Sequence, residues 1–316
     1  MQSPRKPSEY AQRMNRVLDH IDRHLDSALD LESLAEIAHF SPFHFHRMFS
    51  AWMGETLGDY LRRRRLDMAA AHLANQPHIP VLTIALGVGF GSGEAFARAF
   101  RQRFGCTPTE WRVASPQRWA EELARQRRRD SNLDQDQRKP DQSSAGCHGH
   151  HGDSLNKEFT MDIKLVNFAP VRVAYLRRIG AYGPGVTAFW QQTVWPWIQA
   201  HGLENAARYG VGHDDPGITA PDKCRYDACV AVPDDFVATS PANIAVLPGG
   251  RYASAHFRGP APLATQAWTE LLRDWLPSSG MQPDGRPFFE YYPSDAYYDI
   301  ATATIECQLC LPVRPL

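Results

Sequence analysis

Residues 84–112 read IALGVGFGSGEAFARAFRQRFGCTPTEWR, and the spacing of their apolar side chains predicts two short helices that pack together. The helices expected over 82–88 and 92–104 carry facing apolar residues: Ile84, Ala85 and Val88 on the first, and Phe96, Phe100 and Phe104 on the second. The outward side of the second helix then carries Gly93, Glu94, Ala97 and Arg98. A helix that reads DNA needs this division, because an apolar stripe fixes it while polar side chains reach base edges.

The same division occurs upstream, in LESLAEIAHFSPFHFHRMFSAW at residues 31–52. Asp30 is expected to cap one helix, and Ser41 followed by Pro42 is expected to open the next, which runs to about Trp52. The predicted contact joins Leu34, Ala35 and Ala38 to Phe45, Met48, Phe49 and Trp52. The outward residues are Phe43, His46 and Arg47, whereas His44 is expected to pack or hydrogen-bond locally.

Further helices are expected over 10–25 and 57–75, and Pro108 is expected to begin a last one. Residues 9–112 resemble the DNA-binding domain of AraC/XylS-family transcription regulators, on the text of 31–70 and of 84–112 with its closing Thr-Pro-Thr-Glu-Trp-Arg. The resemblance implies two helix–turn–helix units, bridged by the 57–75 helix, that enter successive major-groove segments of double-stranded DNA. It also implies promoter sites as targets, with RNA polymerase as a further candidate partner.

Residue roles follow from that resemblance. Base readers are expected at Phe43, His46 and Arg47 in the first unit and at Glu94 and Arg98 in the second. Phosphate contacts are expected from Arg62, Arg63 and Arg101. The sequence departs from much of the family at Gly93 and Ala97, where longer polar side chains are common. The alternative is that the run at 62–65 is only a solvated helix face.

Residues 113–158 change character, being charged, Gln-rich and Ser-rich with almost no apolar periodicity after Leu123. This composition predicts a flexible linker. Cys147, His148, His150 and His151 cluster within it, but a glycine-spaced tract of this kind is more often adventitious than a metal site. Cys307 and Cys310 have zinc-pair spacing, yet an odd offset on a strand sends them to opposite faces. No metal site and no cofactor is expected.

Residues 159–316 alternate between strand and helix patterns, and the order occurs twice. The first expected set is strand 171–179, helix 185–200 and strands 209–213 and 226–232; the second is strand 251–257, helix 263–276 and strands 288–292 and 300–309. A strand–helix–strand–strand unit repeated near a 75-residue period predicts two pseudo-symmetric halves around a shared crevice.

This segment resembles the GyrI-like effector-binding domain, on Val171–Tyr182, Trp190, Tyr226-Asp227, the Phe257–Pro260 string and above all Phe288–Pro293. Strand alternation places Phe288, Glu290 and Tyr292 on one face. A carboxylate between aromatic rings needs a partner, which a planar or lipophilic cation would supply. In related domains a glutamate here engages cationic effectors, and that role is assigned to Glu290, with Tyr226, Tyr292 and Trp190 as cleft walls. The alternatives are an ion pair from Glu290 to Arg258 or Arg286 and an ordinary core for the tryptophans.

The composition is that of a globular protein: 316 residues, 43% hydrophobic and 22% charged, suffice for about two domains. The longest apolar runs are too short for a membrane span, and six cysteines in this length favour a cytoplasmic protein. The front part is slightly basic and the back part acidic, a mild hint that DNA binds the front alone.

The predicted protein is therefore multidomain: an all-α double helix–turn–helix head (1–112), a linker (113–158) and an α+β GyrI-like domain of two strand–helix–strand–strand repeats (159–316). We expect a DNA-binding transcription regulator that senses a small cationic or lipophilic effector, not an enzyme, with no membrane partner. Two alternatives for the C-terminal part are a small-molecule hydrolase and a gyrase-interacting module.

Overall fold

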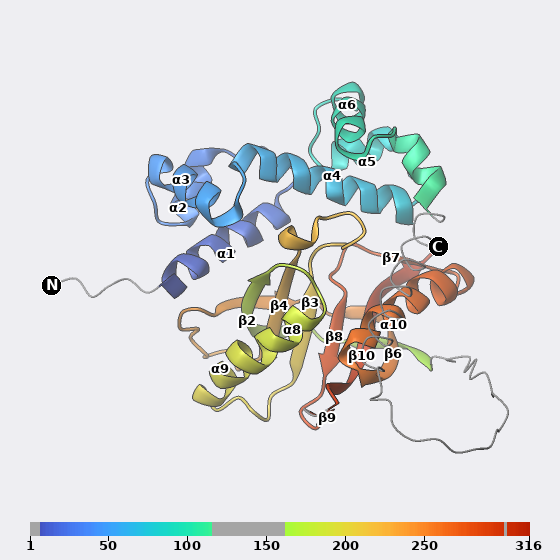
Figure 1. The fold of residues 1–316 in the computed structure, drawn as a ribbon. Helices are drawn as coiled ribbons and strands as arrows, with labels where there is room; N and C mark the ends of the chain where they lie inside the picture. The colour runs from blue at the N-terminus through green and yellow to red at the C-terminus, as the bar shows by residue number, and fades with distance from the viewer. Residues whose placement is uncertain (1–6, 116–161, 300–301) are drawn as a thin grey trace, which may run out of the picture.

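The computed structural model describes residues 7–115, 162–299 and 302–316 (Figure 1). The linker expected at 113–158, including its cysteine and histidines, lies almost wholly outside the described residues. The N-terminal part, called the head, is helical. Its helices are α1 (Pro7–Arg23), α2 (Leu31–Ile37), α3 (Pro42–Met53), α4 (Leu57–Asn75), α5 (Val81–Gly87) and α6 (Gly93–Phe104), followed by a helical segment over 108–115.

Four of these helices begin at a residue whose side chain caps the helix by accepting a hydrogen bond from a backbone amide. The Asp30 carboxylate accepts from the Ser33 amide at 2.8 Å, and Ser41 caps α3 directly before Pro42. Thr56 and Ser92 cap α4 and α6 in the same way. The predicted caps at Asp30 and Ser41 are confirmed, as is the local role of His44, whose Nδ1 lies 2.8 Å from Ser41 Oγ.

Each helix–turn–helix unit has its own apolar core on α4. The first cluster joins α1, α2 and α3 through residues that include Leu34, Phe45 and Phe49. The second joins α4, α5 and α6 through Ile84, Phe96, Phe100 and Trp111, and the Trp111 indole donates to the Ala70 carbonyl at 3.1 Å. One expected contact is wrong: Trp52 is 38% exposed, because it lies at the edge of the buried row of Phe45, Phe49 and Met53 on α3.

The C-terminal domain is a single antiparallel sheet in the order β1-β6-β10-β8-β3-β4-β2-β5, with β7 and β9 also paired to β10. Its strands are β1 (Ile163–Phe168), β2 (Val171–Ile179), β3 (Arg208–Gly212), β4 (Arg225–Ala231), β5 (Asn243–Leu247), β6 (Gly250–Pro260), β7 (Met281–Pro283), β8 (Phe289–Tyr292), β9 (Tyr298–Asp299) and β10 (Thr304–Pro315). Its helices are α8 (Pro184–Phe189), α9 (Trp195–Ala200) and α10 (Ala264–Glu270).

The predicted duplication is confirmed by the element order. Strand β2, helices α8 and α9, and strands β3 and β4 form one unit; β6, α10, β8 and β10 form the other. Both helical segments contain a π-helical turn, over Trp190–Val194 in the first and Leu271–Trp275 in the second. Strands β3 and β8, one from each unit, pair at the centre of the sheet. The expected separation of Cys307 and Cys310 is also confirmed, since they belong to different apolar clusters.

The head lies along one side of the C-terminal domain and touches it with α1 and α4, whereas α6 projects away from it (Figure 1). Contacts at the junction come from the ends and outer faces of β2, β3 and β4. The Asn243 amide nitrogen, which donates to the Gln12 carbonyl at 3.1 Å, ties α1 to the start of β5. The two parts therefore meet through specific polar contacts.

Candidate functional sites: a DNA interface and a ligand cleft

Helix α3 presents three expected base readers to solvent. Phe43 is 68% exposed, and His46 and Arg47 are exposed on the same helix. The Arg47 guanidinium lies 5.8 Å from the centre of the Phe43 ring, so the two side chains support each other. An exposed aromatic ring beside an arginine at the start of a helix is costly to leave in water and suits contact with base edges.

Helix α6 repeats this arrangement in the second unit. Glu94 and Arg98 are exposed, and Arg101 lies one turn further along. Gly93 faces inward instead: a Cβ there would lie 3.3 Å from the Leu82 Cδ1 atom of α5. The small residue at 93 is thus explained by the close packing of α5 against α6.

The spacing between the two units is set by α4. The α2–α3 and α5–α6 pairs lie near opposite ends of this helix (Figure 1). A helix of 19 residues is about 28 Å long. That length is close to the ~34 Å rise of one turn of duplex DNA, so both units can address one face of the double helix.

Two of the three expected phosphate-contacting arginines lie where DNA can reach them. Arg62 and Arg101 are exposed. Arg63 does not fit the expectation, because it is only 9% exposed and its guanidinium pairs with Glu55 at 2.9 Å and Asp67 at 3.3 Å. A helix turns 100° per residue, so neighbouring arginines at 62 and 63 point to different environments. The structure assigns Arg63 to the internal support of α4.

A cleft of about 2550 Å³ opens on the helix-bearing face of the sheet and continues into the junction with the head. This volume exceeds that of a typical small-molecule pocket, because residues of both domains line it. All four expected cleft residues, Glu290, Tyr292, Tyr226 and Trp190, line this one cavity. The structure thus brings together side chains from β8, β4 and the π-helical turn after α8.

Glu290 is half-buried at the centre of this group. The Tyr292 hydroxyl donates to Glu290 Oε2 at 2.9 Å, and the Tyr226 hydroxyl lies 3.5 Å from the same atom. The Trp190 indole donates in turn to the Tyr226 oxygen at 3.0 Å. The expected sharing of a face by Glu290 and Tyr292 is confirmed, and Phe288 also lines the cleft, stacked on Trp268.

Burial raises the pKa of Glu290, and hydrogen bonds from Tyr292, Trp268 and Tyr226 only partly offset this effect. Within the described part of the chain, the side chains that hydrogen-bond to Glu290 are these three neutral donors. The alternative partners are engaged elsewhere: Arg258 pairs with Glu306 at 3.6 Å, and Arg286 pairs with Asp284. Glu290 is thus a carboxylate that a positively charged ligand can neutralise.

Trp268 is a cleft residue that sequence reasoning missed. It lies on α10, at the place in the second repeat where an aromatic ring can reach β8, and its indole hydrogen-bonds Glu290. The duplicated layout could have predicted this role for Trp268, because each repeat has a tryptophan-bearing helical segment beside the central strands. Trp197, by contrast, is buried in the core, as the alternative for the tryptophans expected.

Comparisons with known proteins give a domain match in each part of the chain. Residues 34–114 match a helix-turn-helix domain, and residues 161–314 match the GyrI-like small molecule binding domain. The regulatory protein SoxS of Escherichia coli is 38% identical over 92 residues, which are 29% of this chain and 85% of SoxS. The chain belongs to the AraC family of transcription regulators.

Two further similarities of this AraC-family regulator are to a regulator of Bacillus subtilis and to a solved C-terminal domain. The SPbeta prophage-derived regulator YosT of Bacillus subtilis is 30% identical over 135 residues, 42% of this chain and 90% of YosT. The crystal structure of the EcmrR C-terminal domain covers 50% of this chain and 99% of its own, at 15% identity and a TM-score of 0.40. In the described residues of the AraC-family chain, no helix is both long and apolar enough to cross a bilayer.

Proposed function

We propose that the exposed residues of α3 and α6 read promoter DNA in two successive major-groove segments. The proposed base readers are Phe43, His46, Arg47, Glu94 and Arg98, with Arg62 and Arg101 on phosphates. Their exposure on two helices held about one DNA turn apart by α4 supports this assignment. The proposed place of action is the bacterial cytoplasm, where promoter DNA and RNA polymerase, the further proposed partner, are found.

We further propose that the cleft binds a lipophilic organic cation and that its occupancy changes the DNA-bound state. The observation that carries this proposal is Glu290, whose carboxylate lies among Trp190, Tyr226, Trp268 and Tyr292 with neutral donors as its recorded partners in the described structure. Aromatic faces attract cations, and the carboxylate neutralises the charge of the bound ligand. A neutral ligand of the same shape gains only the contact with the rings.

The test is a pair of isosteric probes titrated into the full chain. N-methyl-4-phenylpyridinium carries a positive charge, and 4-methylbiphenyl has the same shape without it. Quenching of tryptophan fluorescence reports binding, since Trp190 and Trp268 line the cleft. We expect the cation to bind more tightly, and Glu290→Gln to remove most of that preference. Equal affinities for both probes in the native chain would contradict the proposal.

We propose that the cleft binds its ligand without transforming it. Membership of a family of transcription regulators supports this view over the hydrolase and the gyrase-interacting alternatives. The test is chromatography of a cationic probe that has a hydrolysable bond, acetylcholine, after long incubation with the full chain. Unchanged probe is expected, whereas a product that disappears with Glu290→Gln would establish a hydrolase.

A further inference from the structure

The head and the C-terminal domain are joined by a closed ring of four alternating charges. Asp22 of α1 and Arg64 of α4 belong to the head; Asp214, which follows β3, and Arg225 of β4 belong to the C-terminal domain. Arg225 pairs with Asp22 at 2.6 Å and with Asp214 at 2.9 Å. Arg64 pairs with Asp22 at 3.2 Å and also with Asp214, so the ring closes.

The ring is largely buried and electrically balanced, with Asp22 its most exposed member at 22%. The side chains of Asp214 and Arg225 are 0% and 1% exposed. Burial alone would raise the pKa of Asp214, but the guanidiniums of Arg225 and Arg64 outweigh it and lower the pKa to about 2. Breaking such a set on one side leaves uncompensated buried charge, so the ring favours one relative position of the two domains.

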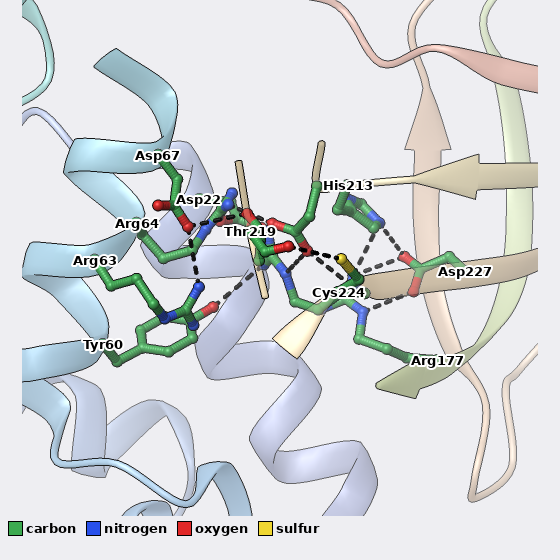
Figure 2. Close-up of polar contacts among 12 residues, drawn as sticks. Asp22, Tyr60, Arg63, Arg64, Asp67, Arg177, His213, Thr219, Cys224 and Asp227 are labelled. Carbon is green, nitrogen blue, oxygen red and sulfur yellow. Dashed lines mark hydrogen bonds and ion pairs between the residues drawn. The ribbon is translucent and has the colours of Figure 1, made fainter. Parts of the chain in front are cut away.

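A second set of contacts continues the junction along the same strands. Asp19 of α1 pairs with Arg177 of β2 at 2.9 Å, and Arg177 pairs with Asp227 of β4 at 2.6 Å. The Tyr175 hydroxyl also donates to Asp19. Figure 2 shows Arg177, His213 and Asp227 grouped on the C-terminal side of the junction. Thus β4 supplies charges to both sets.

The loop over 213–224 also hydrogen-bonds to α4 and to the end of α3. The Thr219 hydroxyl donates to Asp67 at 2.9 Å, and the Lys223 ammonium donates to the Met53 carbonyl at the end of α3. This loop connects β3 to β4 directly. A shift between these two strands therefore reaches the helix that separates the recognition units.

Strand β4 carries the cleft on its other face. Arg225 and Asp227 point toward the head, and Tyr226 between them points into the cleft, where it contacts Glu290 and Trp190. On β3, Gly210 lies beneath the same cleft, four residues before Asp214. The Tyr182 hydroxyl of the cleft lining donates to the carbonyls of both Asp214 and Arg225, at 3.0 and 2.9 Å. On β4 the ring residue Arg225 and the cleft residue Tyr226 thus lie on opposite faces of one strand, while Asp22, Arg64 and Asp214 line the cavity where it meets the head.

We propose that occupancy of the cleft and closure of the ring oppose each other, so that a cationic effector releases the head from its position on the C-terminal domain. This inference rests on the proposed function of the cleft. Tyr226 and Tyr292 both converge on Glu290 Oε2, so a cation that pairs with this atom competes with both tyrosines, and first with the longer contact of Tyr226. Displacing Tyr226 moves the backbone that holds Arg225 and Asp227. By linkage, a chain whose ring is already open binds the effector more tightly.

The experiment measures the affinity of the full chain for N-methyl-4-phenylpyridinium after the ring is opened from the head side. Asp22→Asn and Arg64→Gln each remove one member of the ring; both residues line the cavity where it meets the head, and neither pairs with Glu290, Tyr226 or Tyr292. We expect each to tighten probe binding by about fivefold or more, the usual lower range of allosteric coupling. The double variant is expected to gain less than the product of the two single gains, because both act on one ring. Asp26→Asn, an exposed charge change just after α1, is the matched control and is expected to leave the affinity unaltered.

The outcomes distinguish a failure of the proposed coupling from a failure of the proposed cleft function. If the probe binds the native chain with an affinity that depends on Glu290, but both ring variants bind it equally well, the coupling is wrong and the cleft assignment stands. If the probe binds neither the native chain nor the variants, the proposed cleft function fails and the coupling fails with it. Near-ultraviolet circular dichroism checks folding, and the second ring variant decides the matter if the first does not fold.

Discussion

Gly210 lies directly opposite Glu290 across the central β3–β8 pair, and a Cβ atom at residue 210 would approach Glu290 Oε2 to 2.7 Å and the Tyr226 hydroxyl oxygen to 2.1 Å. Both distances are shorter than any real contact of a Cβ atom, so the bare backbone of β3 makes room for the two polar groups. Because Gly210 has no side chain, the space beside it is free for the Glu290 carboxylate.

The first prediction concerns this glycine. Gly210→Ala is expected to push Tyr226 and Glu290 apart, which lowers affinity for the cationic probe about tenfold and destabilises the fold by about 1–3 kcal/mol. Titration and thermal unfolding measure the two effects. Gly58→Ala is the control, because a Cβ there meets open space on a helix and should be neutral or slightly stabilising. Unaltered probe binding in Gly210→Ala would remove the steric argument.

The second prediction is a pH dependence of ligand binding. Burial raises the pKa of Glu290, so its neutral form persists to higher pH than that of an exposed glutamate. Affinity for the cation is therefore expected to rise as pH rises through this pKa and then to level off. Affinity for 4-methylbiphenyl should stay flat over the same range. Glu290→Gln should flatten the cation profile too, and a slope that persists in this variant would point to another titrating group.

A third prediction separates base reading from phosphate contact. Arg47→Ala is expected to weaken binding to a selected operator by about 1–3 kcal/mol and to relax preference at one base position. Arg62→Ala should weaken operator and random DNA alike and reduce the salt dependence by about one charge. Binding-site selection with each variant measures both effects. Loss of preference in Arg62→Ala alone would reverse the two roles.

The fourth prediction compares two neighbouring arginines. Arg63 is buried between Glu55 and Asp67, so Arg63→Ala is expected to cost about 1.5–3 kcal/mol of folding free energy, because both carboxylates lose this partner although Asp67 keeps Arg103 at 2.9 Å. Arg62→Ala should change stability by less than about 0.5 kcal/mol, because its side chain is exposed. Denaturant unfolding of the two variants is the measurement, and equal stabilities would show that the pairs of Arg63 contribute little.

The fifth prediction concerns Asp215, which lies in the loop that grips α4. Burial raises its pKa to about 6, although the Gly217 amide donates to its carboxylate at 2.8 Å. A raised native pKa means that the folded chain loses stability as pH climbs from about 4 through 6 and is level above that. Asp215→Asn lacks this loss, so it should exceed the native chain by up to about 3 kcal/mol at pH 8. The two should be equally stable near pH 4, where any large difference would contradict the assignment.

The head could be predicted almost completely from the sequence. Helix periodicity, the caps at Asp30 and Ser41 and the bridging helix over 57–75 are all local signals, and α4 has the predicted bounds. Arg63 was misplaced for a physical reason: its partners Glu55 and Asp67 compete with solvent only once α3, α4 and α6 are assembled. A run of four arginines does not reveal which member turns inward.

In the C-terminal domain the duplicated order and the setting of Glu290 were predictable, whereas the head–domain junction was not. Alternation on 288–292 places Glu290 with Tyr292, and a duplicated pattern brings two central strands together. Across the junction, the ring of Asp22, Arg64, Asp214 and Arg225 joins residues that are 150 and 203 positions apart. Each of them is an ordinary surface charge in a linear pattern, and only the packing of α1 and α4 on β3 and β4 buries them.

The nineteen-residue length of α4 is constrained from two sides. On the DNA side, the distance between the two recognition units has to suit the duplex. On the other side, the contacts of Arg64 with Asp214 and of Asp67 with Thr219 fix the rotation of the helix about its axis. Inserting a single amino acid after Asp67 would rotate the second unit by about 100° and advance it by about 1.5 Å, while Arg64 stayed docked. Changes in the length of this helix therefore cannot be absorbed by either neighbour alone, which makes its residue count a stricter constraint than most of its side chains.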